Sequence, residues 1–121
     1  MSCEVAIYPG EDKEFIVDYS DVDVNFADLT DVVVGIVVGD QVRKTCRKVS
    51  PPTPGQAITV NPNNAKQGVF RVFGSDTQAW PKAALTFEIS TTFNDPDFPD
   101  GRKETNVFYA GEVGALKLTN A

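Results

Sequence analysis

The clearest alternation of apolar and polar positions lies between Gly68 and Phe93. In the stretch 85–93, leucine, phenylalanine and isoleucine occupy alternate positions, with threonine, glutamate and serine between them. A period of two is typical of a strand with one buried face. The run 69–73 predicts a second strand, and the SDTQAWP sequence between the two predicts a short helical turn or loop ended by Pro81. We expect Trp80 to fill one end of the core.

The rest of the chain shows the same pattern in shorter pieces, which predict strands at 3–8, 15–19, 22–26, 41–49, 58–60 and 102–109. The uninterrupted apolar run 32–38 predicts a strand covered on both faces, and the Gly39-Asp40 pair predicts a hairpin turn into 41–49. In that return strand, Val42 and Cys46 are expected to share a face with two lysines, which mark an edge strand. Apolar residues at 113, 116 and 118 are expected to form the last part of the domain.

These elements predict an all-β protein. About eight or nine short strands, regular turn signals and no amphipathic helix favour an antiparallel β-sandwich. The chain has 121 residues, eight prolines and nine glycines, with no internal repeat. A chain of this length buries roughly two thirds of its unfolded surface in one core. We therefore expect a single domain over residues 1–121.

Charge and cysteine content indicate which classes of partner the protein binds and in which cell compartment it folds. The formal net charge of −6 disfavours nucleic acid as a partner, and no window is apolar enough to span a membrane. The N-terminal sequence MSCEVAIYPG lacks the basic start and apolar run of a signal peptide, so synthesis in a cytoplasm is expected. Two cysteines are too few for a disulfide framework. Cys3 and Cys46 are expected to be thiols, with Cys46 buried.

Two sets of charged residues invite a binding hypothesis. Four basic residues between 43 and 48 could form a docking patch, but a solvated strand face is the favoured explanation. Aspartates crowd the stretch 12–31, and three more lie in the NDPDFPDG loop at 94–101. Calcium needs several converging oxygens, but neither stretch has EF-hand spacing, and the second lacks a bidentate closing carboxylate. Turns and half-exposed strands are therefore predicted, with no metal site.

The signatures of catalysis are missing from the sequence. The chain has no histidine, which is the commonest general base at neutral pH. It also contains no nucleophile elbow, phosphate-binding glycine loop or paired-cysteine metal spacing. Asp95 and Asp97 could act as acid and base only in a deep cleft that desolvates one of them, and a proline-stiffened loop does not provide one. We expect neither an enzyme nor a bound cofactor.

A family resemblance comes from the order of motifs along the chain: PGEDKEFIVDYSD, a DLT turn before an apolar strand, a GD hairpin, GVFRVFGSDTQAWPKAALTFEIS, and a return through ETNVFYAG. This order resembles the small immunoglobulin-like β-sandwich modules of tailed bacteriophages. Such modules occur in baseplate upper proteins and in fibre or head-decoration attachments. The matching residues are Ser75, Asp76, Thr77, Trp80, Pro81, Glu88 and Ile89.

The resemblance implies a virion structural protein that binds its own copies and neighbouring capsid or tail proteins, without nucleic acid or membrane. Val69, Phe73 and Phe108 are apolar members of otherwise outward faces, so they are the candidate interface residues; a second core layer is the alternative. A carbohydrate-binding β-sandwich is the alternative function, because Trp80 and three tyrosines could stack on sugars. Calcium-dependent adhesion through the aspartates is a third hypothesis.

Overall fold

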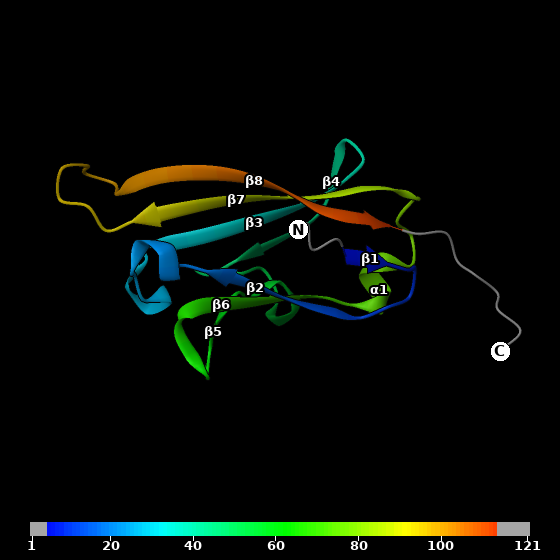
Figure 1. The fold of residues 1–121 in the computed structure, drawn as a ribbon, viewed down its shortest axis with the longest axis horizontal. Coiled ribbons are helices and arrows are strands. Elements are labelled where there is room, and N and C mark those ends of the chain that lie inside the picture. The colour runs from blue at the N-terminus through cyan, green and yellow to red at the C-terminus, as the bar shows by residue number, and fades with distance from the viewer. Residues whose placement is uncertain (1–4, 114–121) are drawn as a thin grey trace, which may run out of the picture.

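The computed structural model describes residues 5–113, which form two facing sheets (Figure 1). The first sheet has the strand order β1-β8-β7-β3-β4, and the second has the order β2-β6-β5. The strands are β1 (Val5–Ile7), β2 (Lys13–Asp18), β3 (Asp31–Val38), β4 (Gln41–Arg47), β5 (Thr59–Asn61), β6 (Asn64–Val72), β7 (Ala83–Phe93) and β8 (Arg102–Val113). The prediction of an all-β protein is confirmed, and a β-sandwich describes it.

Four short helical elements connect the strands. They are the 3-10 helices η1 (Ser20–Val22), η2 (Phe26–Asp28) and η3 (Pro54–Gln56), and the one-turn helix α1 (Gly74–Thr77). The expected helical turn in SDTQAWP is therefore present as α1. Asp76 in this turn accepts a hydrogen bond from the backbone N–H of Phe73, at 2.9 Å, which caps its start.

Pairing between the eight described strands is antiparallel with one exception. β1 runs parallel to β8, with Val5 opposite Gly111 and Ile7 opposite Val113. The expectation of a wholly antiparallel sandwich is wrong at this strand, because the chain crosses from one sheet to the other between β1 and β2. The long β7–β8 hairpin and the β3–β4 hairpin supply the rest of the first sheet.

The core lies between the sheets and follows the predicted alternation. In β3 the even-numbered residues are buried and the odd-numbered ones are half-buried. Coverage of this strand on both faces is therefore only partial, and the outer face of its sheet remains open. Trp80 is 6 % exposed and belongs to the core, as predicted. Phe15 bridges the layers, with its ring centroid 4.8 Å from that of Phe87 and 5.4 Å from that of Phe70.

The strand predicted at 22–26 is wrong, because this segment runs from the last residue of η1 through a turn to the first residue of η2. Its alternating valines and aspartates imitate a strand, but the side chain of Asp18 accepts hydrogen bonds from both the backbone N–H and the hydroxyl of Ser20. These bonds turn the chain at once. Asp23 then takes a left-handed conformation with φ of 53°, which is incompatible with a continuing strand.

A β-bulge places Val42 on the opposite face of β4 from the one predicted. Lys44 pairs with Ile36, yet Val42 pairs with Val37, so one extra residue lies in β4 between these pairs. The extra residue rotates Val42 to the outer face, where it is 57 % exposed. Cys46 and Lys44 stay on the buried face as predicted, and β4 is an edge strand.

Candidate functional site

The three predicted interface residues lie in three different environments. Val69 in β6 is only 5 % exposed, flanked by Ile16 of β2 and Thr59 of β5. It offers almost no surface to a partner, so the alternative of a second buried layer describes it better. Phe73 is 36 % exposed and Phe108 is 51 % exposed.

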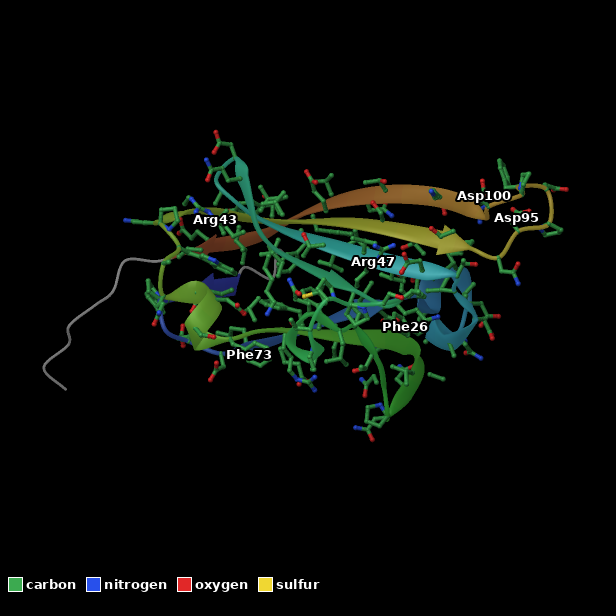
Figure 2. The ribbon with its side chains drawn as sticks, turned by 180° about the vertical axis from the view of Figure 1, so that it is seen from behind. Phe26, Arg43, Arg47, Phe73, Asp95 and Asp100 are labelled. Atoms are coloured by element: carbon green, nitrogen blue, oxygen red, sulfur yellow. The ribbon has the colours of Figure 1, made fainter. Side chains whose placement is uncertain are left out.

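Phe73 is engaged by neighbours within the same chain. It lies beside α1 (Figure 2), and its ring covers Gly55 so closely that an added Cβ there would lie 3.0 Å from it. The ammonium of Lys44 lies 4.5 Å from the ring centroid and 2.5 Å from the carboxylate of Asp76. This cation–π and ion-pair arrangement ties β4 to α1, so part of the Phe73 ring is already used within the chain.

Phe108 lies in the most exposed apolar run of the described chain. Val107, Phe108 and Tyr109 are consecutive in β8 and are 63 %, 51 % and 61 % exposed. β7 pairs with the whole of β8, but on the other side β1 pairs only with Gly111–Val113. From Arg102 to Ala110, therefore, no described strand covers the outer edge of β8.

Below this edge the two sheets leave a groove between β8 and β2. Its volume is about 330 Å³. Phe15, Phe70 and Phe87 form its apolar wall, and Asn106 and Phe108 line it from β8. Val107 and Tyr109 point to the opposite face, since they pair with Glu88 and Thr86. The edge of β8 thus presents apolar side chains on both faces.

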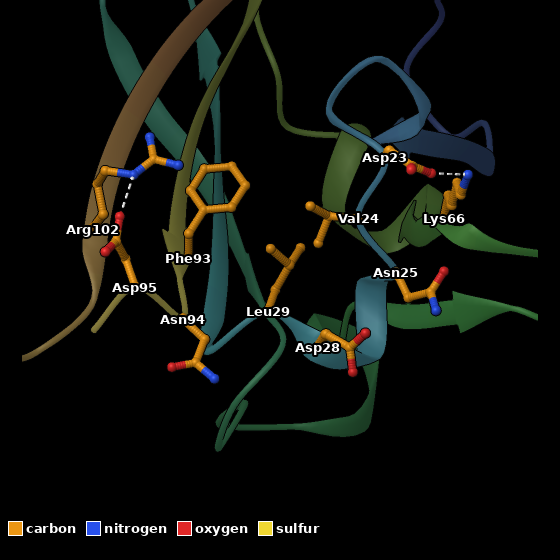
Figure 3. A pocket seen from close by; sticks show the side chains of 10 residues that line it. All are labelled: Asp23, Val24, Asn25, Asp28, Leu29, Lys66, Phe93, Asn94, Asp95 and Arg102. Atoms are coloured by element: carbon orange, nitrogen blue, oxygen red, sulfur yellow. Dashed lines mark hydrogen bonds and ion pairs between the residues drawn. The ribbon is translucent and has the colours of Figure 1, made fainter. Parts of the chain in front are cut away.

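A larger and more polar hollow of about 710 Å³ lies at the end of the sandwich, between the 19–30 segment and the β7–β8 loop (Figure 3). Each side carries an ion pair: Lys66 with Asp23, and Arg102 with Asp95, the latter at 3.2 Å. Since both cations are paired with carboxylates of the same chain, neither is offered to an incoming anion.

The aspartates expected in turns are used within the fold. Asp95 accepts from Arg102 and from the backbone N–H of Asp97, and it lies in the β7–β8 loop with Asp100 (Figure 2). The hydrogen bonds from Ser20 lower the pKa of Asp18, and the hydrogen bond from Lys66 lowers that of Asp23. Among residues 5–113, no three acidic or cysteine side chains converge as a metal site would require.

Most of the basic residues between 43 and 48 are likewise bonded to groups of the same chain. Lys44 pairs with Asp76, and Arg47 contacts Asp31 at 2.8 Å. Lys48 donates to the backbone carbonyls of Phe26, Ala27 and Leu29, and so fixes the η2 turn. Three of the four basic side chains therefore stabilise the fold, which leaves little of the docking patch considered from the sequence.

Most rings expected to stack on a sugar are not accessible. Trp80 and Tyr19 are buried, and the Tyr19 hydroxyl shares a 2.8 Å hydrogen bond with that of Thr91. Tyr8 is half-buried, so Tyr109 is the one exposed ring of this set. Burial also raises the pKa of the Cys46 thiol, which makes it unreactive at neutral pH. Cys3 and residues 116 and 118 lie outside the described residues.

Comparison with protein-family models, with curated proteins and with solved structures gave no match. In the described part of the chain, no helix has the length and apolar character needed to cross a membrane. What the chain does must therefore be argued from its surface.

The sequence indicated Phe108 but missed its neighbours Val107 and Tyr109. Three consecutive apolar residues in an alternating strand place an apolar side chain on both faces, and that signal was available. The sequence did not show that the edge of β8 is uncovered, because this depends on β1 pairing with only the last three residues of β8.

Proposed function

We propose that this chain is an immunoglobulin-like structural module of a tailed-phage virion, which works by contact with its own copies and with neighbouring capsid or tail proteins. It is made in the cytoplasm of a bacterial host and becomes part of the particle. The proposal includes no catalytic activity, cofactor, nucleic acid or membrane. The phage assignment rests on the motif resemblance, and the contact function rests on the surface of β8.

The strand order supports the immunoglobulin-like part of the proposal. Immunoglobulin domains place strands C, F and G in one sheet and B, E and D in the other. Here β3, β7 and β8 occupy the C, F and G positions, and β2, β6 and β5 occupy the B, E and D positions. The buried tryptophan differs, since Trp80 lies between β6 and β7 and not on the strand that matches C.

The observation that carries the contact function is the exposed apolar run on the open edge of β8. Val107 and Tyr109 expose apolar surface on the outer face of this edge, and Phe108 does so on the inner face. An edge strand with exposed apolar side chains is a template for pairing with another chain. The polar groups that could do chemistry are instead paired within the chain, as Asp95 is with Arg102 and Asp76 with Lys44.

Purified particles test the proposal. Phage particles from a host that carries this gene are purified by density gradient and analysed by quantitative mass spectrometry. We expect the chain in multiple copies per particle, retained after a salt wash. Its absence from washed particles, with capsid and tail proteins present, would refute the virion role.

A further inference from the structure

The outer edge of β8 is the longest stretch of edge that no described strand covers. Eight residues, Arg102–Tyr109, pair with β7 on one side and with no described strand on the other, and Ala110 is a bulge. Alternate backbone N–H and C=O groups of such an edge point outward and can pair with another strand. By contrast, β5 has only three residues, β2 has six, and β4 carries basic residues along its length. Short length and basic residues discourage pairing. The charges in the uncovered part of β8 are confined to Arg102–Glu104, so Thr105–Tyr109 is the stretch of edge most open to a partner.

We propose that this edge pairs with the same edge of a second copy, antiparallel, and joins two five-stranded sheets into one. The inference rests on the proposed contact function and specifies the surface of self-association. Residues that face each other in an antiparallel pair lie on the same face of the sheet. The two-fold axis that relates the two copies must therefore pass through a residue, not between two residues. An axis at Asn106 pairs the seven residues Lys103–Tyr109, includes all three exposed apolar residues and stops before the bulge at Ala110.

The cross-strand pairs in this register suit each other. On the outer face, Val107 lies opposite Thr105 of the second copy, and Tyr109 lies opposite Lys103. These are a β-branched pair and an ammonium beside an aromatic ring, both of which are favourable across strands. On the inner face Asn106 meets its own copy and Phe108 meets Glu104. No like charges face each other.

The size of the contact predicts a weak dimer. Aromatic side chains bury roughly 150–250 Å² each, so the exposed parts of residues 107–109 contribute roughly 300 Å² per copy. Stable complexes bury about 800 Å² per partner. We therefore expect dissociation in the micromolar to millimolar range, which suffices in a particle where copies are held close together.

Charge substitutions at facing positions test this register. The dimer dissociation constant of each full-chain variant is measured by sedimentation equilibrium. Tyr109→Lys places two lysines opposite each other at both ends of the contact, and we expect about tenfold weaker dimerisation. Combining it with Lys103→Glu restores an opposite-charge pair and returns the affinity to within about threefold of the original. Val42→Lys, on the outer face of the β4 edge and similarly exposed, should leave the dimer unchanged.

A symmetric cross-link gives an independent check of the axis. In a Cys3→Ser background, Asn106→Cys should form a disulfide-linked dimer under mild oxidation, because facing residues of an antiparallel pair have Cα atoms about 4.5–5.5 Å apart. Thr59→Cys on β5 is the control and should stay monomeric.

A chain that is monomeric at millimolar concentration, or a dimer that Tyr109→Lys leaves intact, would overturn the inference. The outcome is separable from the proposed function. A β8-paired dimer that is absent from particles would refute the virion role alone, and a monomer found in particles would refute the pairing alone.

Discussion

Gly68 in β6 offers the sharpest test of how the core is packed. A Cβ added at this position would lie 2.4 Å from Cε1 and 2.7 Å from Cδ1 of Phe26. Carbon atoms in good contact lie about 3.5–4.0 Å apart, so the ring would have to move by about 1 Å. Phe26 is 2 % exposed, and the turn that carries it is held by Lys48. The ring therefore has little room to yield.

The expected magnitude follows from two opposing terms. Over-packing of a well-packed core costs about 1–3 kcal/mol. Replacing glycine by alanine in a strand recovers about 0.5–1 kcal/mol, because the unfolded chain has less freedom to lose. We expect Gly68→Ala to lower the free energy of unfolding by about 1–2 kcal/mol. Urea denaturation followed by the fluorescence of Trp80, the only tryptophan, measures it.

Two companion variants make the test specific. Gly35→Ala in β3 is the control, because its Cβ would meet neighbours only at 3.8 Å or more, and we expect no loss of stability. Phe26→Leu removes Cε1 and Cζ, two of the three ring atoms nearest Gly68, so Gly68→Ala should cost little in that background. The reasoning is wrong if Gly68→Ala is as stable as Gly35→Ala, or if its penalty persists beside Phe26→Leu.

Two further predictions concern polar side chains that are bonded or buried within the fold. Lys48→Met should lower the free energy of unfolding by about 1–3 kcal/mol, because three carbonyls of the η2 turn lose their donor; unfolding in urea measures this, and an unchanged midpoint would contradict it. Burial raises the pKa of Tyr19 and of Cys46, so the folded chain holds these protons longer than the unfolded chain, and stability is lost as the pH rises above about 9. Thermal melts of Tyr19→Phe should show a shallower alkaline decline than those of the original chain, whereas parallel curves would show that Tyr19 does not contribute.

The sequence predicted the parts of the fold that follow from side-chain alternation. The β7–β8 and β3–β4 hairpins, the turn at α1 and the burial of Trp80 and Cys46 all follow from apolar spacing, turn residues and proline. These are local signals, because neighbours in sequence decide which face a side chain takes.

What the sequence did not predict depends on contacts between distant segments. The valines at 22 and 24 alternate as in a strand, yet the carboxylate of Asp18 turns the chain before one can form. The bulge that exposes Val42 arises from the pairing of β4 with β3, and periodicity does not reveal it.

The candidate site shows the same division. The apolar spacing of 107–109 is visible in the sequence, but the uncovered edge depends on which residues of β8 pair with β1, a strand about 100 positions away in the sequence. Val69 was expected to face outward, and its flanking strands bury it. The pairing of the basic cluster with Asp31, Asp76 and the η2 carbonyls also joins segments far apart in the chain.

The central claim is that the open edge of β8 makes contacts with protein. Hydrogen–deuterium exchange of the intact chain, measured at micromolar and at millimolar concentration, tests it most directly because it reports which amides become covered. We predict that amides in 102–110 exchange more slowly at the higher concentration, while those of β4 and β5 do not change. Unchanged exchange along β8, or protection confined to another edge, would contradict the claim.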